Sequence, residues 1–279
     1  MSDKAIESSQ LGKKANYLDK YDPTILYPIS RKPQDNARQM HGYDLWNLYE
    51  LSWLNRKGKP EVAIGNIIYD SSSKKLIESK SLKLYLNSFN NSKFESIESL
   101  TEIMEQDLSY ALETKVLAKL WKLNNGLKVE FTNPQGFCID YLDISIESFD
   151  FEKRHSLIKE LIISNTIVSE TLHSNLLRSN CPITNQPDWG TLTIQYTGKQ
   201  ISQIKLLEYI LSYRNHNDFH EHCVENIFTE LMTHCNPSTL IVYANYTRRG
   251  GIDINPYRSN HKNPNLKTII LNRQRLVRQ

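Results

Sequence analysis

The segment Cys181–Gly190 carries the two side chains of this chain that are best suited to covalent chemistry. Its sequence, Cys-Pro-Ile-Thr-Asn-Gln-Pro-Asp-Trp-Gly, places a thiol at Cys181 and a carboxylic acid at Asp188. Pro182 and Pro187 keep the segment from forming a helix. A sulfur nucleophile and a proton carrier on one stiff loop are what covalent addition to an electrophilic carbon requires. A buried cysteine beside a turn aspartate is the alternative interpretation.

A second segment, Glu78–Tyr85, combines a carboxylate with basic side chains in the sequence Glu-Ser-Lys-Ser-Leu-Lys-Leu-Tyr. Glu78 could accept two N–H donors from a purine-like edge, while Lys80 neutralises a phosphate. In the alternative, Ser79 or Ser81 caps the helix that follows, and Glu78 lies outside it as a favourable charge near its N-terminus. Both interpretations remain open from the sequence.

The third segment, Phe219–Glu225, brings an aromatic ring, imidazoles and acids together at the start of a predicted helix. Such a group could bind a heterocycle by stacking and edge contacts. Metal binding by His220, His222 and Cys223 with Cys181 is the competing interpretation. On a helix, His222 would point away from the face that His220 and Cys223 share, so this ligand set is strained.

The fourth segment, Thr247–Gly251, places two guanidinium groups, Arg248 and Arg249, beside two glycines. Glycines let the backbone approach a ligand closely, and guanidinium groups bind phosphate, so the segment suits a phosphate-bearing cofactor. A surface turn after a strand is the alternative. The Gly-x-Gly-x-x-Gly motif does not occur in the sequence, so a nicotinamide cofactor would bind by a route other than the Rossmann fingerprint.

The elements that must position these segments are predicted in the same order in both halves of the chain. The first half has strands at 45–54 and 60–69, helices at 81–89 and 99–112, and strands at 116–123 and 127–131. The second half has strands at 175–180 and 190–197, helices at 202–214 and 216–233, and strands at 238–246 and 252–256. A capping-box signal, Ser99 with Glu102, marks the start of the second helix. The pattern predicts an α+β protein of two ββααββ units, joined by a linker near residues 145–160.

Composition restricts the classes of function. The net charge of +3 is too weak to indicate nucleic-acid binding, and Arg273, Arg275 and Arg278 are predicted to form a solvated tail. No apolar run is long enough to cross a membrane, and no secretory signal is visible. The 4 cysteines are scattered without a Cys-x-x-Cys pair, which indicates reduced thiols. We therefore expect a cytoplasmic protein that binds neither nucleic acid nor membranes.

Taken together, these segments resemble the nitrile reductases of queuosine biosynthesis, the QueF family of 7-cyano-7-deazaguanine reductases. The matching segments are Glu78–Phe89, Cys181–Gly190, Phe219–Cys223 and Thr247–Pro256. The resemblance implies tandem tunnelling-fold (T-fold) modules, each an antiparallel sheet with two helices on one face, in a homodimer. We divide the chain into a polar extension at 1–40, a first module at 41–150 and a second module at 151–279.

The resemblance also implies the reaction: 7-cyano-7-deazaguanine is reduced to the 7-aminomethyl compound with two NADPH per nitrile and no metal. Cys181 would form a covalent thioimide, and Asp188 would donate a proton to the nitrile nitrogen. Because an anionic carboxylate beside a thiolate is unfavourable, the pair is expected to share one proton. His220 could orient the substrate nitrogen or relay that proton.

Binding roles follow from the same resemblance. The residues expected to bind substrate are Ile77, Glu78, Ser79, Phe219, His220 and Glu221. The residues expected to bind NADPH are Ser79, Lys80, Arg249 and Gly250. Three other functions are weighed against this one: a zinc-dependent GTP cyclohydrolase-like enzyme, a non-catalytic purine-binding T-fold protein, and a Cys/His hydrolase that acts on amides or nitriles.

Overall fold

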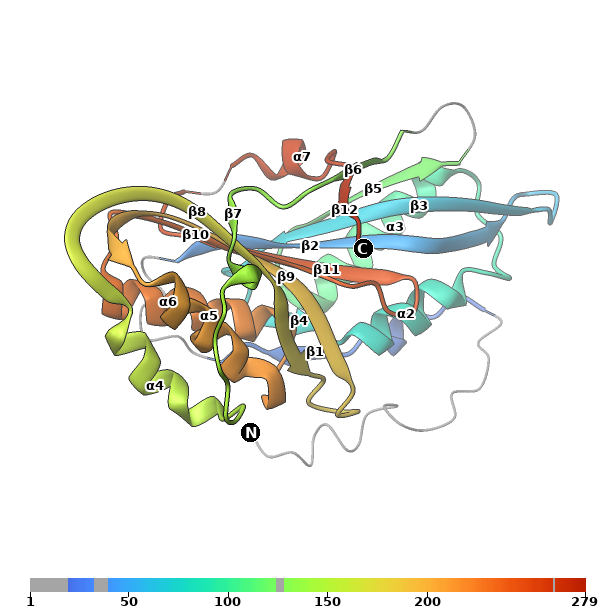
Figure 1. Cartoon of the computed structure of the whole chain (residues 1–279). Helices are drawn as coiled ribbons and strands as arrows, with labels where there is room; N and C mark the ends of the chain where they lie inside the picture. Colours follow the sequence, from blue (N-terminus) through green and yellow to red (C-terminus); the bar gives the residue numbers. More distant parts are fainter. Residues whose placement is uncertain (1–19, 33–39, 124–127, 263) are drawn as a thin grey trace.

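One large sheet forms the centre of the computed structural model, which describes residues 20–32, 40–123, 128–262 and 264–279 (Figure 1). Within these residues the sheet has eight strands in the order β5-β3-β2-β11-β10-β9-β8-β7. Their bounds are β2 His41–Leu54, β3 Pro60–Asp70, β5 Val116–Lys122, β7 Phe137–Cys138, β8 Ile162–Asn180, β9 Pro187–Ile201, β10 Thr239–Tyr246 and β11 Ile252–Ser259. Neighbouring strands are antiparallel, apart from the short parallel pair β7–β8.

Four helices of the described chain cover one face of this sheet: α2 (Ser79–Ser88), α3 (Ile97–Leu112), α5 (Gln203–Ser212) and α6 (His220–Cys235). Alternate strand residues point to the same face, and Trp46 and Ile254, paired across the β2–β11 contact, belong to the core beneath α2 and α3. The short α7 (Leu266–Ile269) packs on the opposite face with Leu45 and Ile68. The predicted α+β class, with two helices on one face of each antiparallel half-sheet, is confirmed.

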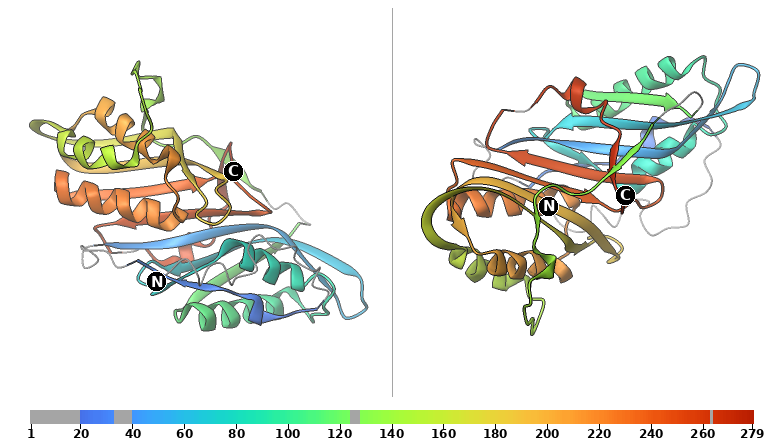
Figure 2. Two further views of the ribbon diagram at one scale, coloured as in Figure 1. Left: turned by 90° about the horizontal axis from the view of Figure 1, so that it is seen from below. Right: turned by 45° about the horizontal axis from the view of Figure 1, so that its top comes forward.

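The two halves meet at the pairing of β11 with β2, whose register runs from Ile252 opposite Leu48 to Ser259 opposite His41. Strand β11, the last strand of the second half in the large sheet, thus continues the sheet of the first half. Figure 2 shows the helix pairs of the two halves side by side along this continuous sheet. None of the described helices is long and apolar enough to cross a membrane.

On the side of the first half, the large sheet has three strands, β2, β3 and β5, while the short β7 joins the opposite edge beside β8. The strand predicted at 127–131 lies partly outside the described residues, and β6 (Glu130–Thr132) pairs in parallel with β12 (Gln274–Leu276) instead of with β5. The prediction of a solvated tail is wrong for Arg275, which is buried. Its guanidinium donates to the Tyr49 hydroxyl and to the Asn66 side chain, so the charge is held in a polar network on the sheet.

The segment between the halves is more ordered than the predicted linker. β8 begins at Ile162, well before the predicted 175, and α4 (Arg154–Leu157) lies between 3-10 turns at 151–153 and 158–160. Ile158 and Leu161 are buried in the second core, and Ile139 also belongs to that core. The domain division itself stays a prediction.

Most of the predicted extension at 1–40 lies outside the described residues. Its described part, 20–32, packs closely against the first half. The rings of Tyr21 and Phe89 stack with their centroids 5.3 Å apart, and β1 (Pro28–Ser30) pairs with β4 (Lys75–Ile77). After β1, the described part of this segment runs toward the N-terminus of α6.

Helix α3 begins one turn earlier than its predicted capping box. Ser96 is the N-cap, with its hydroxyl accepting from the Ser99 N–H at 3.2 Å, and the Ser99 hydroxyl accepts in turn from the Ser96 N–H. The prediction that paired Ser99 with Glu102 is therefore wrong in register. The reciprocal bonds satisfy two backbone N–H donors at the helix N-terminus, and α3 therefore begins directly after Ser96.

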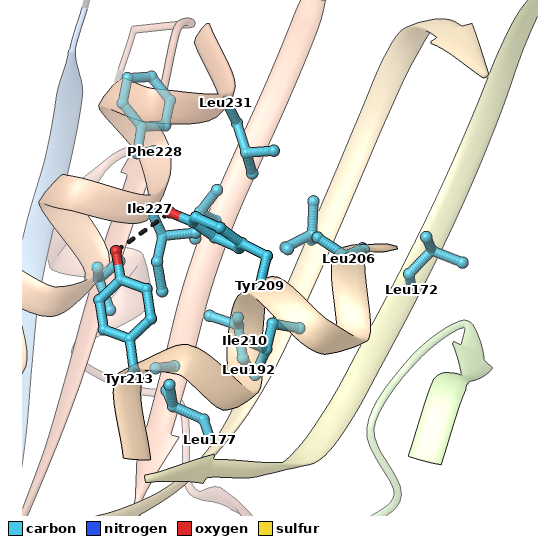
Figure 3. Packing of buried hydrophobic residues seen from close by; sticks show 14 of the residues in the cluster. Leu172, Leu177, Leu192, Leu206, Tyr209, Ile210, Tyr213, Ile227, Phe228 and Leu231 are labelled. Atoms are coloured by element: carbon cyan, nitrogen blue, oxygen red, sulfur yellow. Dashed lines mark hydrogen bonds between the residues drawn. The ribbon is translucent and has the colours of Figure 1, made fainter. Parts of the chain in front are cut away.

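The second core is a dense apolar layer between α5, α6 and strands β8–β10. Leu206, Ile210, Ile227 and Phe228 belong to this layer and are labelled in Figure 3, where the Tyr209 and Tyr213 hydroxyls hydrogen-bond at 3.1 Å. This layer fixes the N-terminus of α6 relative to the sheet.

Phe228→Ala is expected to destabilise the protein by about 3–5 kcal/mol, because it leaves a cavity in a close-packed core. Phe228 is 1% exposed, whereas Phe131 is 66% exposed and provides a matched control. Denaturant unfolding should show the loss for Phe228→Ala and little change for Phe131→Ala. Equal midpoints for the two variants would contradict this packing.

Candidate active site

A cavity of about 340 Å³ lies at the seam between the two halves. Its walls include the N-termini of α2 and α6, the β8–β9 connection, β11 and the turn after β10. It is large enough for one small heterocyclic ligand. Every predicted site residue lines it: Ile77, Glu78, Ser79, Lys80, Cys181, Asp188, Phe219, His220, Glu221, Arg249 and Gly250. The structure thus brings them together, while the role of each stays a prediction.

Cys181 and Asp188 belong to one β-hairpin. The connection is closed by the Cys181 N–H, which donates to the Gln186 carbonyl at 2.9 Å, and by the Asn185 N–H, which donates to the Cys181 carbonyl at 2.9 Å. Asp188 was expected on the same loop as Cys181 but is already in β9. Pro187 begins that strand, where its missing N–H is tolerated. The strand buries Asp188 to 3% exposure, whereas Cys181 is only partly buried.

The Asp188 carboxylate is paired with two basic groups. One oxygen forms an ion pair with the Arg249 guanidinium, and the other lies 3.5 Å from His220 Nε2. Burial alone would raise the pKa of this carboxyl, but His220 and Arg249 together hold the pKa below its usual value. These two pairings favour the ionised form of Asp188, and the sharing of one proton with Cys181 stays a prediction.

The N-terminus of α6 is fixed by Asp218. Its carboxylate accepts from the Phe219 N–H at 2.9 Å and lies 3.0 Å from His222 Nδ1, and Lys32 Nζ donates to it at 2.7 Å. Burial acts to raise the pKa of Asp218, but neighbouring histidines lower it well below its usual value. The contacts of Asp218 orient Phe219, His220 and Glu221 toward the cavity, while the His222 ring contacts Asp218 itself.

Glu221 is a buried carboxylate with an unsatisfied oxygen. Its exposure is 2%, and Oε1 accepts no hydrogen bond from any residue that the structure describes. Burial raises the pKa of Glu221, and the nearby charge of Asp44 adds to this rise. An unpaired acceptor in a closed site is costly, so Glu221 is suited to a ligand that brings N–H donors.

A buried network of four charged groups lies behind Glu221, and the sequence analysis missed it. Arg258 pairs with Asp44 at 2.8 Å and with Glu225 at 2.7 Å, and Arg31 pairs with the same two carboxylates. Two guanidinium groups thus balance two carboxylates. Because the four residues come from the N-terminal segment, β2, β11 and α6, the network ties both halves together below the cavity.

Glu78 itself caps α2, so the prediction that Ser79 or Ser81 is the cap is wrong. Its carboxylate accepts from the Lys80 N–H at 2.9 Å and from the Ser81 N–H at 2.6 Å. Burial raises the pKa of Glu78 despite the lowering effect of these bonds. Each carboxylate oxygen keeps a further lone pair, so capping leaves Glu78 able to accept ligand N–H groups.

Cationic side chains gather at one side of the cavity. Lys80 and Lys83 come from α2, and Arg249 and Gly250 come from the turn after β10. Lys83 donates to the Gly250 carbonyl and pairs with Glu50. The sequence analysis missed Lys83, although its spacing of three from Lys80 is a helical signal for a shared face.

The backbone beside these cations adopts a conformation that favours glycine, with φ of 57° at Gly250 and 77° at Gly251. A side chain on Gly251 would lie 2.6 Å or less from the Glu50 carboxylate atoms, so the turn needs glycine. An open backbone next to Lys80, Lys83 and Arg249 fits a phosphate-bearing cofactor.

Metal ligation has no matching set of side chains among the residues that the structure describes. No group of three or more His, Cys, Asp or Glu residues there could hold a metal ion. His222, one of the proposed ligands, contacts Asp218 instead. The zinc-dependent alternative therefore lacks a ligand set in this part of the chain.

Fold and cavity together define an α+β protein of two halves, each with two helices on one face of its part of the sheet, and the cavity that holds Cys181 lies between these halves. Residues 17–120 match the family model of the nitrile reductase, 7-cyano-7-deazaguanine-reductase, N-terminal part. Residues 187–265 match the model of the QueF-like proteins. The two ranges together cover more than half of the sequence. The chain belongs to the QueF family of nitrile reductases, in its two-module form.

Among solved structures, the chain is similar to the archaeosine synthase QueF-Like in its apo form. The identity is 17%, the alignment covers 37% of this chain and 100% of that chain, and the TM-score is 0.31.

Proposed function

We propose that the protein reduces 7-cyano-7-deazaguanine to 7-aminomethyl-7-deazaguanine with NADPH, through a covalent thioimide on Cys181. The observation that carries the proposal is the unsatisfied, buried carboxylate of Glu221 in the same cavity as the Cys181 thiol. A guanine-like ring offers N–H donors to such a carboxylate, and its nitrile offers an electrophilic carbon to sulfur. Family membership supports the nitrile-reductase class.

Substrate binding uses both modules. Glu221 and Glu78 accept N–H donors of the ring, Phe219 packs against its face, and Ile77 and Ser79 complete the contact. Purines that lack these donors should be rejected, because they would leave buried carboxylates unpaired.

The covalent step adds S–H across the C≡N bond. Cys181 loses its proton to the ionised Asp188, the sulfur bonds to the nitrile carbon, and the proton passes to the nitrogen. The product is a thioimide, whose carbon accepts hydride more readily than the nitrile carbon does. His220, 3.5 Å from Asp188, orients the nitrogen or relays the proton.

NADPH would supply hydride to that carbon, twice for each nitrile. Ser79, Lys80, Arg249 and Gly250 would hold it, with the basic side chains on its phosphates. After the first reduction, Cys181 leaves as thiolate and an imine remains for the second. Asp188 supplies protons to the nitrogen.

One assay separates this function from its rivals. Protein mixed with 7-cyano-7-deazaguanine and NADPH should consume NADPH, seen as loss of its absorbance, in a ratio of two per nitrile. A hydrolase would release ammonia without NADPH, and a purine-binding protein would bind without turnover. A cyclohydrolase-like enzyme would instead require stoichiometric zinc.

Asp188→Asn is expected to lower kcat by about 10²–10⁴-fold with a small change in KM, because an amide cannot carry the proton. Steady-state kinetics over both substrates measures the two constants. Asp143→Asn, at an exposed position, is the control and should match the wild type. A large rise in KM with kcat unchanged would show that Asp188 only supports binding.

A homodimer and a cytoplasmic location are further parts of the proposal. Sedimentation of the purified protein tests the first, since a dimer would have twice the 32.5 kDa mass of the chain.

A further inference from the structure

The Arg249 side chain lies between the buried part of the cavity and the side where the cationic residues gather. Its guanidinium pairs with Asp188 through one nitrogen and donates to the Gln186 side chain through another. The Arg249 side chain is 38% exposed, whereas that of Asp188 is 3% exposed. A half-exposed cation therefore neutralises a buried anion, and only the cation has room to move.

Few groups compensate the charge of Asp188. Among the described residues, it forms ion pairs with Arg249 after β10 and with His220 on α6. Tyr246 on β10 and Cys223 on α6 also face it, and burial raises the pKa of both, which favours their neutral forms. Glu221, also on α6, would add negative charge rather than remove it. Loss of Arg249 would thus leave His220, 3.5 Å away, as the remaining ion-pair partner of this buried carboxylate among the described residues.

The same guanidinium belongs to the group expected to bind phosphate. Arg249 lies in a tight turn, where its N–H and carbonyl both pair with Ile252, and the following Gly250 contacts Lys83. A phosphate beside Lys80 and Lys83 would carry more negative charge than one carboxylate and would accept both arms of the guanidinium. Asp188 and a cofactor phosphate therefore compete for Arg249.

We propose that Arg249 is a positioning residue with two positions, which sets the protonation state of Asp188. It pairs with Asp188 in the free enzyme and moves to a cofactor phosphate when the cofactor binds, so that Asp188 takes up a proton from solvent. The inference rests on the proposed function, in particular on binding of a phosphate-bearing cofactor at this turn.

Such a switch would give Asp188 the two forms that the reaction needs. Before the cofactor binds, the ionised carboxylate accepts the Cys181 proton during thioimide formation. After the cofactor binds, the protonated acid donates to nitrogen as the carbon receives hydride. Each reduction then consumes one solvent proton through Asp188, and the charge on carbon and nitrogen balances.

The direct test is proton uptake when NADP⁺ binds the full-length protein without substrate. Isothermal titration calorimetry in buffers with different ionisation heats at one pH gives the number of protons taken up. The wild type should take up about one proton per NADP⁺, as expected for one buried carboxyl whose charge partner has left. Asp188→Asn should bind NADP⁺ without this uptake.

Three matched variants sharpen the result. Arg249→Gln should lose the uptake, because the variant has no guanidinium group that could leave Asp188. Lys80→Gln should bind more weakly but keep the uptake, and Arg248→Gln should keep both, since Arg248 lies over the Tyr49 ring with its guanidinium carbon 4.3 Å from the centroid. Binding by the wild type without uptake would overturn the switch but leave the proposed function standing. Failure of NADP⁺ to bind at all would overturn both.

A second readout needs no cofactor. The rate of thioimide formation from 7-cyano-7-deazaguanine alone, followed by mass spectrometry of quenched samples, should fall at low pH as Asp188 becomes protonated. Because His220 and Arg249 both lower the pKa of Asp188, Arg249→Gln should move this fall to higher pH, whereas Arg248→Gln should not. Identical profiles for Arg249→Gln and the wild type would contradict the inference.

Discussion

Cys181→Ala is expected to abolish both the covalent adduct and the consumption of NADPH. The Cys181 thiol is the partly exposed sulfur of the cavity, whereas Cys223 and Cys235 are buried. Burial also raises the pKa of both buried thiols, so they are poor nucleophiles. Without a sulfur at 181, the nitrile carbon stays a poor hydride acceptor. Intact-protein mass spectrometry after incubation with substrate alone measures the adduct.

Cys138→Ala is the matched control, because Cys138 is also partly buried but lies near Asn175, away from the cavity lining. It should keep the adduct and the turnover. Adduct formation by Cys181→Ala, or reduction at an undiminished rate, would remove Cys181 from the mechanism.

The local parts of this site were predictable from the sequence. The prolines around Cys181 indicate a turn, and Phe219–Glu225 opens a segment with a helical pattern, so each segment specifies its own backbone. The alternating apolar residues of β9 and β10 likewise specify strands with one buried face. The resemblance to the family then supplied the expectation that these segments meet.

The pairings between distant residues were not predictable. Arg249 is expected to bind the cofactor, and its pairing with Asp188 was not foreseen, because that contact depends on which anion lies close to it in the folded chain. The charged network of Arg31, Asp44, Glu225 and Arg258 joins four separate elements, and isolated charges give no sign of burial in a sequence. Strand pairing has the same limit, since three residues of β6 carry too little pattern to predict a partner.

Glu221→Gln is expected to raise KM for 7-cyano-7-deazaguanine by about 10–100-fold while leaving the protein as stable as the wild type, or more stable. Hydrogen bonds to a charged group contribute about 1.5–3 kcal/mol, and an amide accepts through only one of its two heteroatoms. The carboxylate is held in the free protein at a cost, because it is buried beside Asp44. Removal of its charge should therefore weaken substrate binding and, at the same time, leave the free energy of unfolding unchanged or higher.

Glu225→Gln provides the matched comparison, one turn further along α6 and equally buried. Its carboxylate pairs with both Arg31 and Arg258, so its loss should destabilise the protein by about 3–5 kcal/mol. Thermal unfolding and substrate titration of the two variants give the contrast. Substitution of a residue with a structural role should mainly lower the stability of the protein, whereas substitution of a residue that binds the ligand should mainly lower the affinity for that ligand. An unchanged KM for Glu221→Gln, or a fall in its stability like that of Glu225→Gln, would place the purine contact elsewhere in the cavity.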